Sequence, residues 1–206
     1  MIERLACMMG RNDETPNIEL AEYLCRNGEE NGIKEIVAGF NGKDKAVASD
    51  CIKVLYEIGE RAPELIGGYA DDFIRGLKSS NNRLVWGSMT ALAKIAAIAP
   101  RPIYERLGEV ISAYENGSTI TVDNSVSVFA GLCKADAGYA KTVTPILLRH
   151  LAACRPKEVP QHAERASVCF NGDNAGAFIK VLEERRPELT ASQQARVNKL
   201  LKRIRH

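Results

Sequence analysis

Three carboxylates, Glu35, Asp72 and Glu109, follow one another at intervals of 37 residues in a chain of 206. Equal positions of stacked helical repeats form rows about 8–10 Å apart, so these side chains are expected to share one acidic row. Such a row would attract a basic peptide or helix and repel phosphate. Alternatively, the carboxylates serve solubility and pair locally, as Asp72 would with Arg75. Ile146 occupies the next equivalent position and ends the row.

Two neighbouring rows come from the same interval. One contains Ala38, Arg75, Ser112 and Arg149, and the other contains Gly67, Tyr104 and Lys141. Exposed rows on a repeat protein are surfaces on which a partner can lie. We therefore expect Arg75, Tyr104 and Arg149 to belong to the same partner-binding surface as the carboxylates.

Trp86 is the only tryptophan, and its equivalents in the neighbouring units are the polar residues Ser49 and Asp123. A position that is polar elsewhere faces outward or half-outward, so Trp86 is a candidate binding hot spot. The equally weighted alternative is that it covers a loop or the groove between repeats.

The C-terminal end of the chain is basic. It has no acidic residue after Glu188 and carries Arg196, Lys199, Lys202, Arg203 and Arg205. Such a helix could bind nucleic-acid phosphates or an acidic protein surface. The favoured alternative is that these cations complement the negative end of a helix dipole, because no aromatic or glycine-rich RNA-binding motif accompanies them.

His150 and Cys154 stand four residues apart and could supply two metal ligands on one helix face. A structural zinc site needs four ligands, and His162 and His206 are not spaced to complete it, so we expect no metal site. The six cysteines include no C-x-x-C pair, which is typical of reduced thiols used as small hydrophobic residues. No phosphate-loop, dinucleotide, zinc-protease or serine-hydrolase motif is present, so we expect no catalytic residue and no cofactor.

The elements that must position these residues are amphipathic helices. Apolar residues recur every three or four positions, as in Val85, Met89, Leu92 and Ile95, which is the spacing of one helix face. A shift of 37 carries this set onto apolar residues of the next unit. Pro63 and its counterpart Pro100 predict the start of a second helix in each unit, because proline is tolerated at the first helical position.

Five two-helix units and a cap account for the whole chain as one domain spanning 1–206. The expected units are approximately 1–43, 44–80, 81–117, 118–155 and 156–189, and residues 190–206 form a capping helix. Polar turn stretches such as Asn41–Asp44 and Ser79–Asn82 separate them and offer helix N-caps.

Composition agrees with an ordinary globular chain. Hydrophobic residues make up 45% and charged residues 26%, and the net charge of +2 predicts no general attraction to nucleic acid or anionic membrane. No apolar run approaches the roughly 18 residues that span a bilayer, and the first apolar run is shorter than that of a secretory signal. We therefore expect a cytoplasmic protein.

The segments 54–66 and 91–100, helix followed by a proline turn, resemble HEAT-type repeats of the armadillo-like superfamily. The resemblance implies an all-α fold, a right-handed α-solenoid of about five two-helix repeats with a C-terminal capping helix. It also implies that the second helices line a concave surface that binds another macromolecule. We expect a non-enzymatic scaffold or adaptor for another protein or peptide, the alternative being a nucleic-acid-associated protein that uses its basic C-terminal end.

Overall fold

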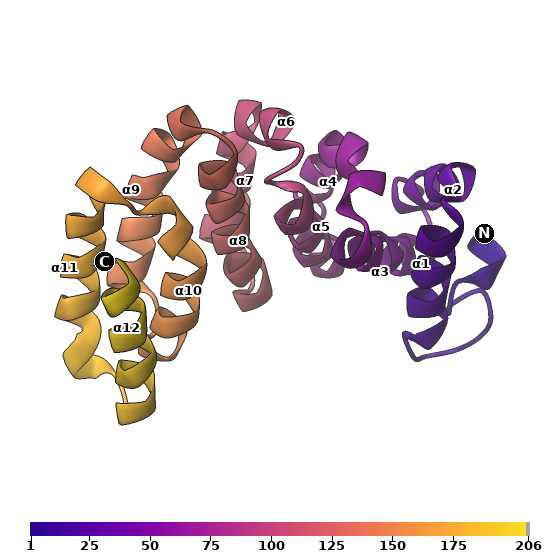
Figure 1. The fold of residues 1–206 in the computed structure, drawn as a ribbon. Helices are drawn as coiled ribbons and strands as arrows, with labels where there is room; N and C mark the ends of the chain where they lie inside the picture. Colours follow the sequence, from indigo (N-terminus) through magenta and orange to yellow (C-terminus); the bar gives the residue numbers. More distant parts are fainter. Residues whose placement is uncertain (205–206) are drawn as a thin grey trace. The chain divides into compact units, whose positions relative to one another are not determined.

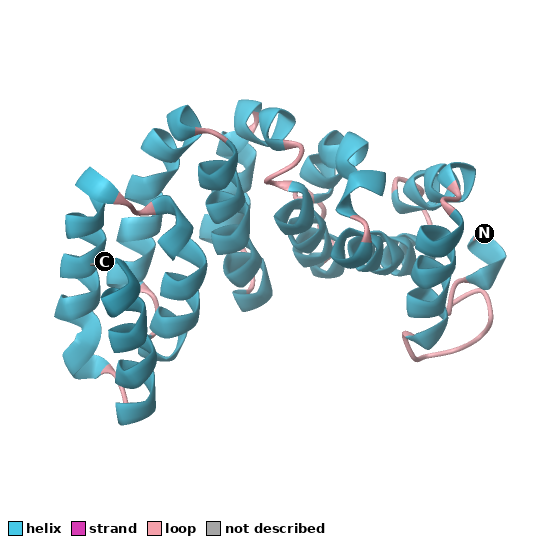
Figure 2. Cartoon of the chain, viewed as in Figure 1, coloured by secondary structure: helices cyan, strands magenta, loops and turns pink. Residues whose placement is uncertain are grey.

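A computed structural model describes residues 1–204, with all their side chains except that of residue 173. Within this part of the chain the regular structure is entirely helical, in α-helices and short 3-10 turns (Figures 1 and 2). The α-helices are α1 (Thr15–Asn27), α2 (Glu30–Phe40), α3 (Lys45–Arg61), α4 (Ala70–Gly76), α5 (Asn82–Ile95), α6 (Pro100–Glu105), α7 (Leu107–Asn116), α8 (Thr119–Ala135), α9 (Ala137–Ala153), α10 (Val159–Ala166), α11 (Ala175–Arg185) and α12 (Ala191–Ile204). The fold is an all-α solenoid, as expected.

The 37-residue repeat is visible at the N-termini of α3, α5 and α8, the first helices of three successive units. Helices α3, α5 and α8 start at intervals of 37 residues, each directly after a polar residue. Asp44 accepts hydrogen bonds from two backbone N–H groups of α3, and Asn81 accepts one from Arg83 of α5. The Ser118 hydroxyl lies 3.4 Å from the Thr121 backbone nitrogen of α8. These side chains satisfy N–H groups that a helix leaves without partners at its first turn.

The expected single second helix after each proline is wrong for two units. Pro63 begins a 3-10 turn, Pro63–Leu65, that is followed by a second turn, Gly67–Tyr69, and only then by α4. Pro100 begins the short helix α6, and the chain bends at Arg106 before α7. Proline favours the first helical turn, but the glycines after Pro63 favour irregular backbone, so both units contain more than two helical segments.

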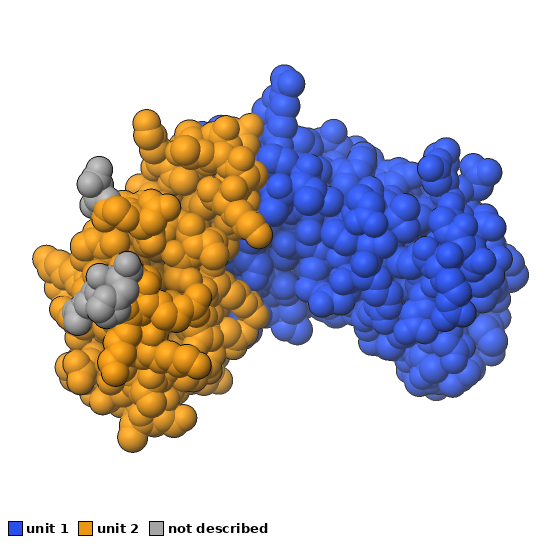
Figure 3. Space-filling model, viewed as in Figure 1, with its two compact units in different colours: residues 1–128 blue, residues 129–206 orange. Residues whose placement is uncertain are grey.

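The chain divides into two compact units, Met1–Val128 and Phe129–His206 (Figure 3). In the first unit, α1, α3 and α5 pack side by side, α2 packs on α3 and α4 packs on α5. Its core contains fully buried side chains from the apolar pattern, among them Ile52, Leu55, Phe73, Met89 and Leu92. The expectation that residues 1–206 form one domain stays a prediction.

Glycines allow the closest helix approaches in the first unit. A Cβ atom on Gly87 of α5 would lie 2.8 Å from Ile52 of α3, and one on Gly76 of α4 would lie 2.2 Å from the Ser88 hydroxyl of α5. Separations this short are below any normal contact. The repeat interface therefore depends on these two glycines.

The second unit is built from the end of α8 and from α9, α10, α11 and α12. Leu147, Leu151, Phe178 and Val197 supply fully buried side chains to its core. Phe170 stacks on Phe178 with ring centroids 4.4 Å apart. Among the described residues, no helix is long and apolar enough to cross a membrane.

Candidate functional site

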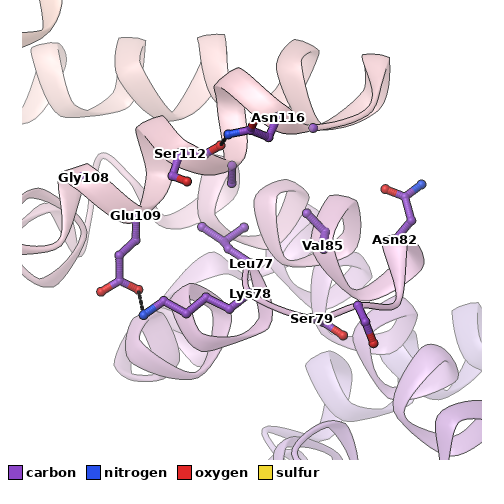
Figure 4. A pocket seen from close by; sticks show the side chains of 12 residues that line it. Leu77, Lys78, Ser79, Asn82, Val85, Gly108, Glu109, Ser112 and Asn116 are labelled. Atoms are coloured by element: carbon purple, nitrogen blue, oxygen red, sulfur yellow. Dashed lines mark hydrogen bonds and ion pairs between the residues drawn. The ribbon is translucent and has the colours of Figure 1, made fainter.

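A pocket of about 460 Å³ lies in the first unit, between the end of α4, the start of α5 and one face of α7 (Figure 4). Its apolar lining comes from Leu77, Val85 and Ala113, of which Leu77 and Ala113 are buried. Its polar lining comes from side chains that are exposed or half-buried, namely Lys78, Ser79, Ser80, Asn82, Glu109, Ser112 and Asn116. The pocket thus combines an apolar interior with amide, hydroxyl and charged groups at its edge.

Glu109 is the predicted residue that lines this pocket. Its carboxylate accepts two hydrogen bonds from Arg106, at 2.9 and 2.8 Å, and lies 3.0 Å from the Lys78 ammonium. The bonds from Arg106, helped by Lys78, lower the pKa of Glu109 to about 2. The carboxylate is therefore ionised at neutral pH and engaged within the chain.

Replacing Glu109 with glutamine should make stability less dependent on acidic pH. A folded-state pKa of about 2 lies below the ordinary value of 4.5, so the stabilisation is present above pH 4.5 and is lost as the pH falls toward 2. Because the pair is partly exposed, the effect is expected to stay below about 1 kcal/mol. The free energy of unfolding in urea is measured for the unaltered protein and for Glu109→Gln over this pH range. The difference between the two should narrow as the pH falls. A difference that stays constant with pH would contradict the prediction.

The structure shows what holds the other two carboxylates of the predicted row. Asp72 accepts a 2.7 Å hydrogen bond from the Asn41 amide and pairs with Arg75. Glu35 accepts 2.9 and 3.2 Å bonds from the Met1 amine and the Ile2 backbone N–H. All three carboxylates therefore pair within the chain, as the solubility and local-pairing interpretation expects.

Two of these contacts join equivalent positions of successive repeats. Asn41 and Lys78 are 37 residues apart, as are their partners Asp72 and Glu109. In each case a donor just after one second helix bonds a carboxylate of the following repeat. The row thus stabilises the stacking of repeats in the first unit.

The remaining predicted surface residues lie in different places. Arg75 is exposed on α4, and Tyr104 is half-buried on α6. Arg149 is exposed on α9, in the second unit. The structure joins Arg75 directly to the carboxylate row through Asp72.

Trp86 is half-buried and packs across the groove between α3 and α5. Its ring centroid lies 5.9 Å from that of Tyr56, and the Arg83 guanidinium lies 5.9 Å from the Trp86 ring. The buried Lys53 ammonium lies 4.8 Å from the Tyr56 ring and pairs with Glu57 at 2.8 Å. Trp86 therefore contacts the neighbouring helix α3 through Tyr56, and its role as a binding hot spot stays a prediction.

The basic residues of α12 are only partly available for a partner. Arg196 forms two hydrogen bonds, of 3.0 and 2.6 Å, to the Glu164 carboxylate of α10. Lys199, Lys202 and Arg203 are exposed, and the predicted Arg205 lies outside the described residues. The free charge at this end is therefore smaller than the sequence suggests.

The expectation that His162 cannot join His150 is wrong. His150 Nε2 lies 2.8 Å from His162 Nδ1, and both imidazoles are buried. The candidate ligand atoms of these histidines and of Cys154 all lie within 4.8 Å of one another. The chain reverses direction between α9 and α10, so residues twelve apart meet; His206 lies outside the described residues.

The pocket itself was not predicted from the sequence. Its polar residues lie mostly in the inter-repeat turns, which indicate only helix ends when read alone. A usable signal existed in the small and amide residues at equivalent turn positions, Gly42, Ser79 and Asn116. The six cysteines are free thiols, three buried and three half-buried, as expected.

No protein-family model matches the chain, and no curated protein matches its sequence. Among solved structures, the chain is similar to an engineered protein, with a TM-score of 0.73 at 16% identity over 99% of this chain and 96% of the other. It is also similar to a designed armadillo repeat protein in complex with the peptide (KR)4, with a TM-score of 0.71 at 13% identity over 88% and 84% of the two chains. A second designed armadillo repeat protein gives a TM-score of 0.70 at 15% identity over 92% of each chain. The chain therefore has an armadillo/HEAT-like helical repeat fold.

Proposed function

We propose that this protein is a non-enzymatic scaffold that binds an extended peptide segment of another protein at the pocket between α4 and α7. The observation that carries the proposal is the pocket's lining, an apolar interior with amide and hydroxyl groups at its edge beside the ion pair of Lys78 and Glu109. The complex of a similar designed armadillo repeat protein with a peptide supports the same class of partner.

The size of the pocket favours a peptide over a folded surface. A volume of about 460 Å³ accepts one side chain together with some adjoining backbone. Leu77, Val85 and Ala113 would contact an aliphatic side chain, whose burial contributes roughly 1.5–3 kcal/mol. A residue of the size of leucine or methionine is therefore the expected anchor.

The polar edge fits the backbone of an extended chain. Asn82 and Asn116 carry side-chain amides, which both donate and accept hydrogen bonds, as peptide groups do. The Ser112 hydroxyl lines the same pocket and is exposed. Backbone bonds at this edge would hold the peptide while the apolar interior selects its side chain.

Gly108 allows the proposal to be tested without disturbing the core. It lines the pocket as the second residue of α7, and a Cβ atom there would meet no atom within 4 Å. Gly108→Leu should therefore fold normally while placing an isobutyl group at the pocket. Gly176→Leu is a matched control, because Gly176 is the second residue of α11 and is equally open.

The experiment selects peptides from a random library on the full-length protein and measures their affinity by titration calorimetry. We expect selected peptides to share an aliphatic anchor, and Gly108→Leu to weaken their binding at least about tenfold, equivalent to 1.4 kcal/mol. Gly176→Leu should bind as the unaltered protein does. A failure to select peptides, or equal loss in both variants, would refute the proposal.

The alternative function, nucleic-acid binding through α12, predicts a different experimental result. Retention on DNA at low salt that is lost steeply with added salt, and that requires Lys199, Lys202 and Arg203, would favour a role for α12. The ion pair between Arg196 and Glu164 speaks against it, because that cation is already neutralised within the chain.

A further inference from the structure

We propose that His150, Cys154 and His162 form a zinc-binding site in the second unit. The site joins the end of α9 to α10, and its three side chains offer the nitrogen and sulfur ligands that Zn²⁺ prefers. It is independent of the peptide-binding pocket, since all three residues belong to the second unit.

The backbone places the ligands on one side of the α9–α10 turn. His150 lies in the last turn of α9, and Cys154 follows four residues later as the residue that ends this helix, its N–H bonded to the His150 carbonyl at 2.7 Å. His162 lies on α10, which packs against α9. Local helix geometry thus fixes two ligands and helix packing brings in the third.

The two histidine nitrogens need only a small adjustment to hold a metal ion, and the Cys154 sulfur, which lies within 4.8 Å of them, would approach to the about 3.6 Å that a tetrahedral site requires. Tetrahedral Zn²⁺ with bonds of 2.0–2.1 Å to nitrogen separates two histidine nitrogens by about 3.3 Å. The His150 and His162 nitrogens are 2.8 Å apart, so they would have to part by about 0.5 Å. In the structure these nitrogens share a hydrogen bond; when the ion binds, its proton would move to the other nitrogen of the same imidazole, and the Cys154 thiol would release its proton to solvent.

The burial of both histidine side chains is unusual. His150 is 6% exposed and His162 1% exposed, whereas histidine is usually only partly buried. Metal-ligating imidazoles are often enclosed in this way, with the surrounding protein fixing their orientation. Arg185 provides such support beside Cys154, donating 2.6 Å hydrogen bonds to the Leu151 and Cys154 carbonyls.

The fourth position of the tetrahedron would fall to water. Cys154 is half-buried, so solvent reaches the edge of the site. The nearby Glu158 carboxylate is bonded to the Arg155 guanidinium and backbone N–H, which keeps it engaged elsewhere.

The test titrates Co²⁺, a spectroscopic substitute for Zn²⁺, into the full-length protein after treatment with a chelator. We expect a single equivalent to give the visible bands of tetrahedral Co²⁺ and a thiolate-to-cobalt charge-transfer band, both lost when Zn²⁺ displaces it. Zn²⁺ at about a hundredfold excess over its Kd should raise Tm by about 5–10 °C.

Two single substitutions test whether the proposed ligands bind the metal ion. Cys154→Ser should abolish the charge-transfer band, and it should fold because serine is close to cysteine in size and the position is half-buried. His162→Gln should weaken binding by more than the about 10–100-fold that loss of an outer-shell partner costs. Circular dichroism checks that both variants remain folded.

Other thiols supply the controls. The free thiols of Cys133 and Cys169 interact with each other in the second unit and are the alternative place for a soft metal ion. Cys133→Ser and Cys25→Ser should keep the charge-transfer band. No such band in the unaltered protein, its survival in Cys154→Ser or its loss in Cys133→Ser would overturn the proposal.

Discussion

Replacing Phe73 with alanine is expected to lower the free energy of unfolding by about 3–5 kcal/mol. Phe73 is fully buried on α4 and packs against Phe40 of α2 with ring centroids 6.2 Å apart. It therefore joins the second helices of two successive repeats. Alanine loses the transfer free energy of the ring and leaves a cavity that packed helices cannot fully close.

Urea unfolding followed by Trp86 fluorescence and far-UV circular dichroism measures this loss. Trp86 lies in the same unit as Phe73, so its emission reports on the affected core. Ile98→Ala serves as the control: Ile98 is 52% exposed, and its loss should change stability by no more than about 0.5 kcal/mol. A Phe73→Ala protein as stable as the control would contradict the packing described for α2 and α4.

Replacing Arg185 with methionine is expected to cost about 3 kcal/mol, because it leaves carbonyls without a donor and removes a buried cation from its partners. The Arg185 side chain, on α11, is 9% exposed and pairs with Glu188 at 3.0 Å. It also donates to the last-turn carbonyl of Leu151 and to that of Cys154, both at 2.6 Å. There it satisfies acceptors that a helix leaves open at its C-terminus and complements the negative end of the dipole.

Arg186→Met is the matched control, since Arg186 is the next residue and is exposed. Urea unfolding by circular dichroism should show the loss for Arg185→Met and little change for Arg186→Met. Hydrogen exchange should accelerate at the end of α9 in the first variant. Equal stability of the two variants would mean that the Arg185 bonds contribute nothing to the packing of α11 on α9.

The helices of the repeat could be predicted from the sequence because the information is local. Apolar spacing defines the buried face of each helix, and Asp44, Asn81 and Ser118 recur at the same position before α3, α5 and α8. Such caps act on backbone groups two or three residues away, so a single segment suffices to predict them. The breaks before α4 and α7 were missed, because a proline indicates a helix start but not where that helix ends.

The candidate sites depended on contacts between segments, which spacing alone does not give. The sequence predicts the row of Glu35, Asp72 and Glu109 as an interval, but three of the donors that bond it, Met1, Asn41 and Lys78, come from other segments of the chain. The sequence does not predict His162 as a partner of His150, because the two are twelve residues apart, more than one helix turn. Its approach follows from the reversal between α9 and α10, where the sequence predicts only a boundary between the units 118–155 and 156–189.

Chemical-shift mapping of a selected peptide on the isotopically labelled full-length protein tests the central claim most directly. Binding at the pocket predicts the largest amide shifts at Leu77, Ser79, Ser112, Ala113 and Asn116, and their absence in Gly108→Leu. Shifts concentrated on α12, or on the α3–α5 groove around Trp86, would contradict a peptide site between α4 and α7.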